Sequence, residues 1–151
     1  MTTFSDAVKV ARSYAYRWSI EEFHKTWKTG AWEIESSQLR SYEALHRWGV
    51  LLATVAARVE RLKKLSREQP NIDALTEFSR HELDAAIVLS QTKTVKVGED
   101  ITLNQAVRLV AMVGGYTGRK RDGPPGSITI RRGLNQVIPA AIVLAAQSSS
   151  G

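Results

Sequence analysis

Residues 14–28 read YAYRWSIEEFHKTWK, and this stretch decides how the first part of the chain folds. It contains neither proline nor glycine and is rich in residues compatible with helices, so it predicts an α-helix. Tyr14, Arg17, Glu21 and Lys28 follow one another at intervals of 3, 4 and 7 residues. At about 100° per residue, these intervals place all four side chains on one helical face across roughly four turns.

This face combines a phenol, two cations and a carboxylate, which makes it unsuitable for a hydrophobic core. Spacing alone leaves two interpretations open. The face could be solvated and stabilised by ion pairs between residues four apart, such as Arg17 with Glu21. It could instead hold a phosphate backbone beside a metal ion, with the cations on phosphates, the phenol on sugar and the carboxylate on the metal.

The predicted first helix begins at Ser5, a good N-cap residue, with Asp6 in the first turn. Thr29-Gly30 predicts its end, because glycine commonly follows the last turn of a helix. A second helix is predicted from about Gln38 to Ser66. Its apolar positions are spaced 3, 4, 3, 4 and 3 residues apart: Leu45, Trp48, Leu52, Val55, Val59 and Leu62. This spacing fits a core helix of its own domain or a helix that pairs subunits.

Two capping boxes predict short helices after Gln69-Pro70-Asn71, one opening at Ser79 and one at Thr102. Between them, residues 95–97 fit a short strand or an extended loop. Residues 114–126 form the clearest loop, with five glycines and two prolines. A last helix is predicted from about Ser127 to Ala146, kinked or broken at Pro139, and the tail from Ser148 is expected to be disordered.

The composition is that of a globular protein: 151 residues, 43% hydrophobic and 24% charged. The net charge of +6 favours a polyanionic partner. The absence of cysteine excludes disulfides, thiolate metal sites and cysteine nucleophiles. The N-terminus does not resemble a signal peptide, and residues 137–146 are too short to span a bilayer, so we expect a soluble, cytoplasmic protein without a membrane partner.

The stretch 14–28 resembles the Y-x-x-R-x-x-x-E-x-x-x-x-x-x-K signature of insertion-sequence DDE transposases, and its text R-W-x-I-E-E-F-H-K-x-W-K resembles the Tn-five-type branch. Residues 109–116, the basic run 119–121 and Gly133-Leu134 are similar to the C-terminal region of that branch. The resemblance implies a mainly α fold: the C-terminal helix of a ribonuclease-H-like catalytic core, followed by a helical dimerisation region. It divides the chain into residues 1–30, from the catalytic core, residues 31–147, the helical region, and the tail 148–151.

The resemblance also implies roles for individual residues. In this family two aspartates and a glutamate hold two divalent metals, Mg²⁺ or Mn²⁺, which activate nucleophiles against phosphodiesters. Glu21 matches the glutamate and would be the catalytic metal ligand. Tyr14, Arg17 and Lys28 would contact transposon-end DNA, with His24 and Lys25 as further candidates one turn away.

Both aspartates of the triad are missing from the sequence, since Asp6, Asp73, Asp84, Asp100 and Asp122 lie in predicted caps, loops and helices. We therefore expect a C-terminal transposase fragment that is inactive by itself and binds no metal stably. The alternative is a non-enzymatic helical protein that dimerises with full-length transposase and inhibits it. A generic helical DNA-binding module is a third possibility. No small-molecule substrate is expected.

Two other features carry expectations. The basic residues 119–121 lack the order of a nucleotide-binding loop, and they fit either a solvated loop or a DNA-backbone contact. Without a sheet beside the first helix, the aromatic and aliphatic side chains off the charged face would be partly exposed, which predicts self-association or marginal stability. These side chains are Trp18, Ile20, Phe23 and Trp27.

Overall fold

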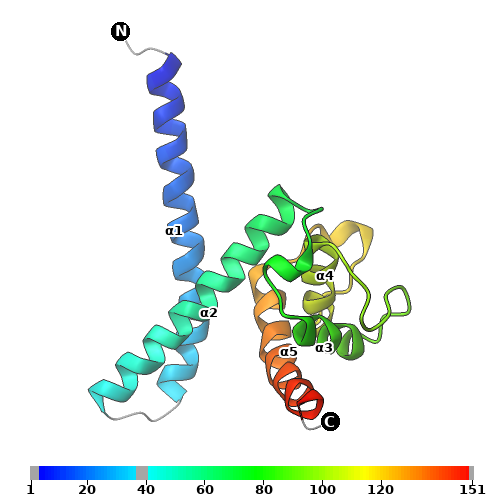
Figure 1. The fold of residues 1–151 in the computed structure, drawn as a ribbon. Helices are drawn as coiled ribbons and strands as arrows, with labels where there is room; N and C mark the ends of the chain where they lie inside the picture. Colours follow the sequence, from blue (N-terminus) through cyan, green and yellow to red (C-terminus); the bar gives the residue numbers. More distant parts are fainter. Residues whose placement is uncertain (1–3, 37–40, 150–151) are drawn as a thin grey trace. The chain divides into compact units, whose positions relative to one another are not determined.

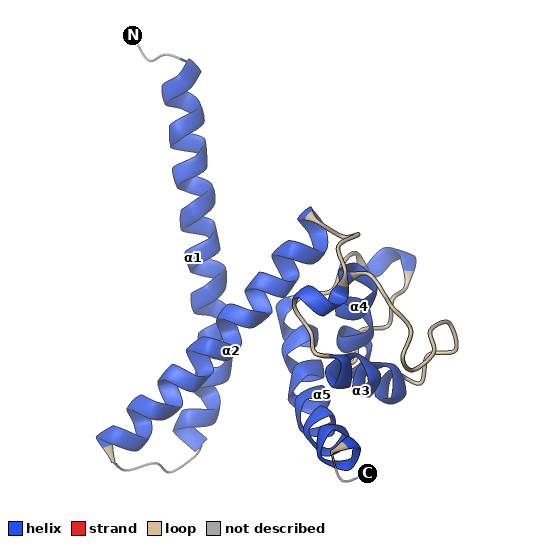
Figure 2. Cartoon of the chain, viewed as in Figure 1, coloured by secondary structure: helices blue, strands red, loops and turns tan. Residues whose placement is uncertain are grey.

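The computed structural model describes residues 4–36 and 41–149, and all regular elements in these ranges are helical (Figures 1 and 2). The five α-helices are α1 (Phe4–Ser36), α2 (Tyr42–Glu68), α3 (Arg80–Ser90), α4 (Leu103–Val113) and α5 (Ser127–Ser148). Two 3-10 turns, η1 (Ala74–Thr76) and η2 (Lys120–Asp122), complete the order. The mainly α fold predicted from the sequence is confirmed. The chain divides into two compact units, residues 1–60 and 61–151.

Helix α1 is longer than the sequence predicts. It already includes Phe4 and Ser5, so Ser5 lies inside the helix and is not its N-cap, whereas Asp6 lies in the first turn as expected. The helix also continues through Thr29-Gly30 to Ser36. A single glycine destabilises a helix interior by only about 1 kcal/mol, and the following residues contain no proline, so Gly30 does not end the helix.

The apolar positions of α2 become more buried toward its C-terminal end. Leu45 is 37% exposed, whereas Val59 and Leu62 are fully buried. Within the first unit, buried Thr26 of α1 donates a hydrogen bond of 2.7 Å from its hydroxyl to Glu60 Oε1 of α2. The core interpretation of this helix is therefore confirmed for its last turns.

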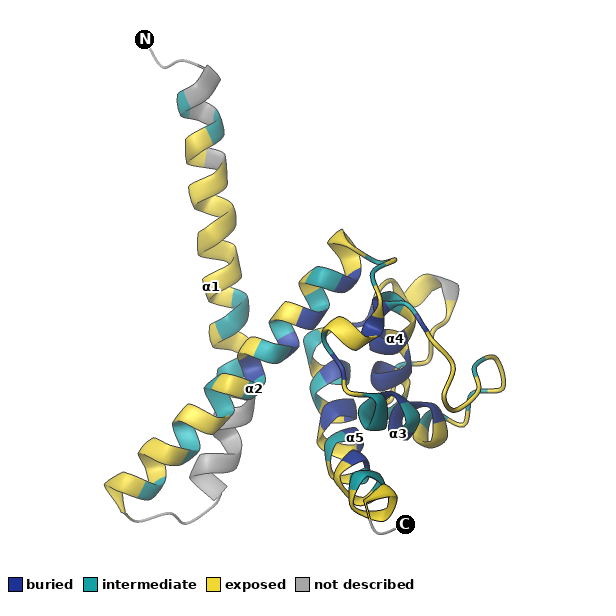
Figure 3. Cartoon of the chain, in the orientation of Figure 1, coloured by how far each residue is buried: buried dark blue, intermediate teal, exposed yellow. Residues whose placement is uncertain are grey.

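Helices α3, α4 and α5 pack against one another and form the core of the second unit (Figure 3). The predicted capping boxes are confirmed: the hydroxyls of Ser79 and Thr102 accept hydrogen bonds from the backbone N–H groups of Glu82 and Gln105, and the N-cap N–H groups donate back to those side chains. The largest fully buried side chains of this unit are Leu62, Leu83, Leu103, Val107, Val110, Ile130, Leu134 and Val137.

Two glycines permit a close approach of α4 and α5. A Cβ atom built on Gly133 would lie 1.8 Å from the carbonyl oxygen of Val110, and one on Gly114 would lie 1.9 Å from that of Thr129. The φ of Gly114 is −81°, which any residue can adopt. Glycine is needed there because a side chain has no room, and not because of the backbone conformation. The two helix backbones therefore touch where these glycines lie.

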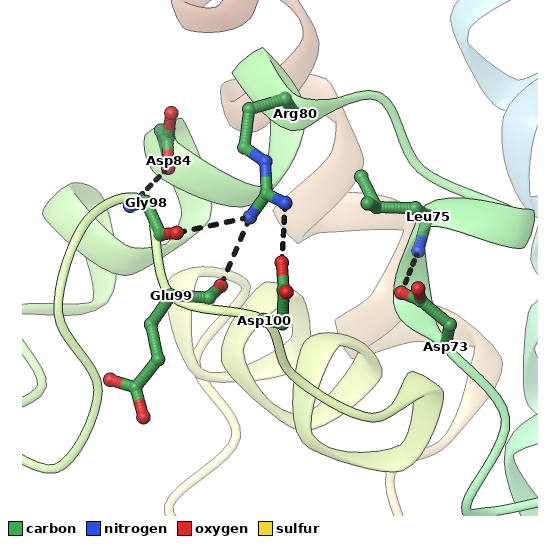
Figure 4. A network of polar contacts seen from close by, with 7 residues as sticks. All are labelled: Asp73, Leu75, Arg80, Asp84, Gly98, Glu99 and Asp100. Atoms are coloured by element: carbon green, nitrogen blue, oxygen red, sulfur yellow. Dashed lines mark hydrogen bonds and ion pairs between the residues drawn. The ribbon is translucent and has the colours of Figure 1, made fainter.

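A loop follows α3 and is held to it by Arg80 (Figure 4). The guanidinium donates to the carbonyl oxygen of Glu99 at 3.1 Å and to Asp100 Oδ1 at 2.5 Å, and Asp84 Oδ1 accepts a bond from the Gly98 N–H at 2.9 Å. The hydrogen bond to Asp100 raises the pKa of Arg80 above its ordinary value. Residues 95–97, left open as strand or loop, belong to this loop.

The last turns of α2 are attached to the second unit by polar contacts. Arg61 forms a forked ion pair with Glu77, with Nη2 2.7 Å from Oε1 and Nε 2.9 Å from Oε2. Asn104 Nδ2 donates to the carbonyl oxygen of Ser66 at 3.1 Å. These contacts fix the C-terminal part of α2 within the second unit.

Helix α5 passes through Pro139 without a break and ends at Ser148, with Ser149 as its C-cap. The tail predicted to be disordered begins at Ser148, the last residue of this helix, and its residues 150–151 lie outside the described residues. Between residues 4 and 149, leaving out 37–40, no helix combines the length and apolarity needed to cross a membrane.

Candidate nucleic-acid interface on helix α1

The predicted face of α1 points to solvent. Tyr14 is 68% exposed, and the side chains of Arg17 and Glu21 are 74% and 56% exposed. Figure 3 colours the residues of the middle turns of α1 as exposed. The structure therefore places these three residues on one accessible helical face, as their spacing predicts.

Arg17 and Glu21 form an ion pair on this face. Arg17 Nε lies 3.1 Å from Glu21 Oε1, with a spacing of four residues along the helix. An exposed pair of this kind contributes only about 0.3–0.5 kcal/mol to stability. Both groups therefore remain available to an incoming charged ligand, since little free energy opposes their separation.

The other candidate residues lie on the next turns of α1. His24 is exposed, and its ring centroid lies 5.8 Å from that of Phe23 and 6.2 Å from that of Trp27. Lys25 is exposed. Lys28 belongs to α1, but its side chain lies outside the described residues. The structure thus brings Tyr14, Arg17 and Glu21 together on one face.

A contact absent from the sequence prediction anchors this helix. The buried Thr26 hydroxyl donates a hydrogen bond to Glu60, which lies 34 residues away in the sequence. Local periodicity carries no signal for such a long-range contact. This hydrogen bond joins α1 to α2 within the first unit.

The donor set of the described residues does not fit a complete two-metal centre. In the ranges 4–36 and 41–149, no three His, Asp or Glu side chains are grouped so that they could hold a metal ion. Glu21 supplies one carboxylate of the kind that Mg²⁺ binds, and its neighbour on the face is the cation of Arg17. Around Glu21 the described residues therefore lack the grouped carboxylates that a two-metal centre needs.

The expectation that apolar side chains of α1 are exposed is confirmed. Trp18 is 61% exposed and Ile20 is 57% exposed, while Phe23 and Trp27 are partly buried.

Two protein-family models match the sequence. The model described as the transposase Tn5 dimerisation domain matches residues 54–150, which is well over half of the chain. The model described as the transposase DDE domain matches residues 2–57, a range that contains the whole Tyr14 to Lys28 stretch. The first match covers the end of α2 and all of α3, α4 and α5.

Proposed function

This chain belongs to the Tn5-type DDE transposase family and corresponds to its C-terminal part, and from this premise we propose that α1 presents a DNA-contacting face with one catalytic carboxylate. In this proposal Glu21 is one ligand of the divalent cation, Mg²⁺ or Mn²⁺. Tyr14, Arg17 and Lys28 contact the backbone of transposon-end DNA. His24 and Lys25 are neighbouring contacts.

The observation that carries the proposal is the exposed face with its Arg17–Glu21 pair. A guanidinium beside a carboxylate on an open helical surface can meet both charges of a phosphodiester site, because the cation binds phosphate oxygens and the carboxylate binds a metal ion. Tyr14 is exposed on the same face, where its ring can pack against a sugar of the DNA backbone. The match to the DDE domain over the same residues supports this assignment.

For the second unit we propose self-association through α5. Pro139, Ile142 and Val143 are exposed at helical spacing, and Ile142 and Val143 have 64% and 56% of their surface accessible. The opposite face of α5 is buried in the core through Ile130, Leu134 and Val137. An apolar stripe opposite a core-facing stripe suits a contact with a second copy, in agreement with the match to a dimerisation domain.

Residues 1–151 are expected not to cleave DNA by themselves, because a two-metal centre needs several oxygen ligands and the described residues contain no group of three candidate ligands. The purified chain should leave a supercoiled plasmid carrying transposon ends intact in Mg²⁺ and in Mn²⁺. Nicking that disappears in Glu21→Ala but persists in Glu22→Ala would overturn this part of the proposal.

A second candidate function is inhibition of a longer transposase of the same family by mixed pairing. The exposed stripe of α5 favours it, since a surface suited to a second copy also suits a longer chain with the same helix. Co-purification with such a transposase and reduced strand transfer in its presence are the expected results. Strand transfer that is unchanged at saturating amounts of this chain would contradict it.

A further inference from the structure

The loop between α4 and α5 has a backbone fixed by its own contacts. Tyr116 donates from its backbone N–H to the carbonyl oxygen of Ala111 at 2.8 Å and from its hydroxyl to that of Gly123 at 2.5 Å. Gly118 and Gly123 have φ values of +68° and +65°, which side-chain-bearing residues rarely adopt. The tyrosine thus joins the two ends of a tight turn whose bends are made by glycine.

Asp122 holds the tip of this loop. Its Oδ2 accepts a hydrogen bond of 2.9 Å from the backbone N–H of Arg119 and another from the Thr117 hydroxyl. Its own N–H donates to the carbonyl oxygen of Arg119 at 2.9 Å. The carboxylate is therefore engaged by the backbone and a hydroxyl of the loop, which keeps the 3-10 turn in place.

The C-terminal end of the loop is attached to α2. Arg67 Nη2 donates to the carbonyl oxygen of buried Pro125 at 3.2 Å, and Lys63 Nζ donates to Ser127 Oγ at 3.0 Å. A surface that is ordered before binding loses less conformational entropy when a ligand arrives. The backbone that carries the side chains of this loop is therefore ordered before a ligand binds.

Three arginines project from this region. Arg119 and Arg121 are exposed on the turn, and Arg108 is exposed on α4. The Arg108 guanidinium carbon lies 5.7 Å from the centre of the Tyr116 ring, and its Nη2 would be 3.9 Å from a Cβ atom on Gly118. Arg108 therefore lies over the residues that lead directly into Arg119. We name this surface, Arg108 with residues 116–123, the arginine loop.

We propose that the arginine loop is a second contact surface for the phosphate backbone of duplex DNA, separate from the face of α1. Guanidinium groups bind phosphate oxygens through a planar fork of donors, and the two on the turn together with Arg108 on α4 can meet neighbouring phosphates. The Tyr116 ring is half-buried and its hydroxyl is engaged, so the loop offers no aromatic platform for bases. The proposed contact is therefore made by the arginines to phosphates and not by stacking on bases. The choice of DNA as the polyanion rests on the proposed function.

The test compares two charge-matched double variants of the whole chain. Arg119→Gln with Arg121→Gln removes two positive charges from the arginine loop, and Lys93→Gln with Lys96→Gln removes two exposed charges from the loop after α3. Binding to a short fluorescent duplex of arbitrary sequence is followed by anisotropy over a series of salt concentrations. Each lost phosphate contact lowers the slope of log K against log salt by about 0.9.

The arginine-loop variant should lose about 2 from this slope, and the lysine variant should keep the wild-type slope. Thermal unfolding that matches the wild type shows that both variants remain folded. Equal losses in the two variants would overturn the proposal, and so would an unchanged slope in the arginine-loop variant. If Arg17→Gln lowers the slope while the arginine-loop variant does not, the DNA face of α1 stands and the second surface falls.

Discussion

Gly133→Ala is expected to destabilise the second unit by about 3 kcal/mol or more, at the upper end of the range for overpacked cores. The added methyl group would lie 1.8 Å from the carbonyl oxygen of Val110 and 2.9 Å from Val110 Cγ1. Backbone atoms cannot rotate away as a flexible side chain can, so α4 and α5 must separate. This separation opens gaps around Val110 and Leu134, which are fully buried. For a unit of this size, we expect Tm to fall by roughly 12–24 °C.

The matched control is Gly126→Ala, in the same unit and at the N-cap of the same helix. Nothing lies within 4 Å of a Cβ atom at Gly126, and its φ of −92° is open to any residue. Its expected effect is below about 1 kcal/mol, the usual difference between N-cap residues. Thermal and urea unfolding followed by circular dichroism measure both variants. Equal stability of Gly133→Ala and Gly126→Ala would show that α4 and α5 are not in backbone contact.

Ile142→Asp combined with Val143→Asp should abolish self-association of the chain. These side chains lie on the exposed face of α5, away from the core residues Leu134 and Val137. Two carboxylates on an apolar contact lose hydration without gaining a partner, which weakens association by several kcal/mol, or by at least about 100-fold in Kd. Light scattering coupled to size exclusion should show a monomer where the wild type shows a dimer.

Val88→Asp combined with Val97→Asp provides the matched control. These valines are exposed to a similar degree, 59% and 57%, and lie on α3 and the loop after it. This variant should associate as the wild type does. A monomeric wild-type chain, or a loss of association in the control as large as in the α5 variant, would contradict the assignment of α5 as the contact surface.

Much of the second unit could be predicted from the sequence because its boundaries depend on local chemistry. Ser79 and Thr102 are N-cap residues whose partners lie only three positions further on, and the glycines from Gly114 onward end α4 as predicted. The spacing that includes Leu62 likewise predicted burial, because core-facing positions repeat with the helical turn.

The contacts that the sequence did not reveal join residues far apart. Arg61 pairs with Glu77, Arg80 holds the loop that contains Asp100, and Thr26 bonds to Glu60. Nothing in the neighbourhood of either partner indicates which distant group it meets. The continuation of α1 beyond Gly30 was missed for a different, local reason. One glycine is a weak helix stop signal, and the helix-forming residues that follow outweigh it.

For the candidate site, periodicity predicted which residues share a face but not their chemistry. Tyr14, Arg17 and Glu21 are exposed together as predicted, and the exposed pair of Arg17 with Glu21 fits both a solvated face and a DNA-binding face. These interpretations are separated by a measurement in which removing the positive charge and removing the negative charge change the affinity for DNA in opposite directions.

Binding of single-charge variants of α1 to duplex DNA in the presence of EDTA is this measurement. A carboxylate held near phosphates repels them, so Glu21→Gln should bind about 5-fold more tightly, the equivalent of roughly 1 kcal/mol. Arg17→Gln should bind more weakly and lose about 0.9 from the salt slope. Glu22→Gln and Arg12→Gln, which lie off this face by their helical spacing, should stay close to the wild type. The contradicting result is that each variant on the face shifts the affinity no differently from its control off the face. Glu21→Gln would then match Glu22→Gln, and Arg17→Gln would match Arg12→Gln. In that case the face of α1 does not contact DNA and the account is wrong.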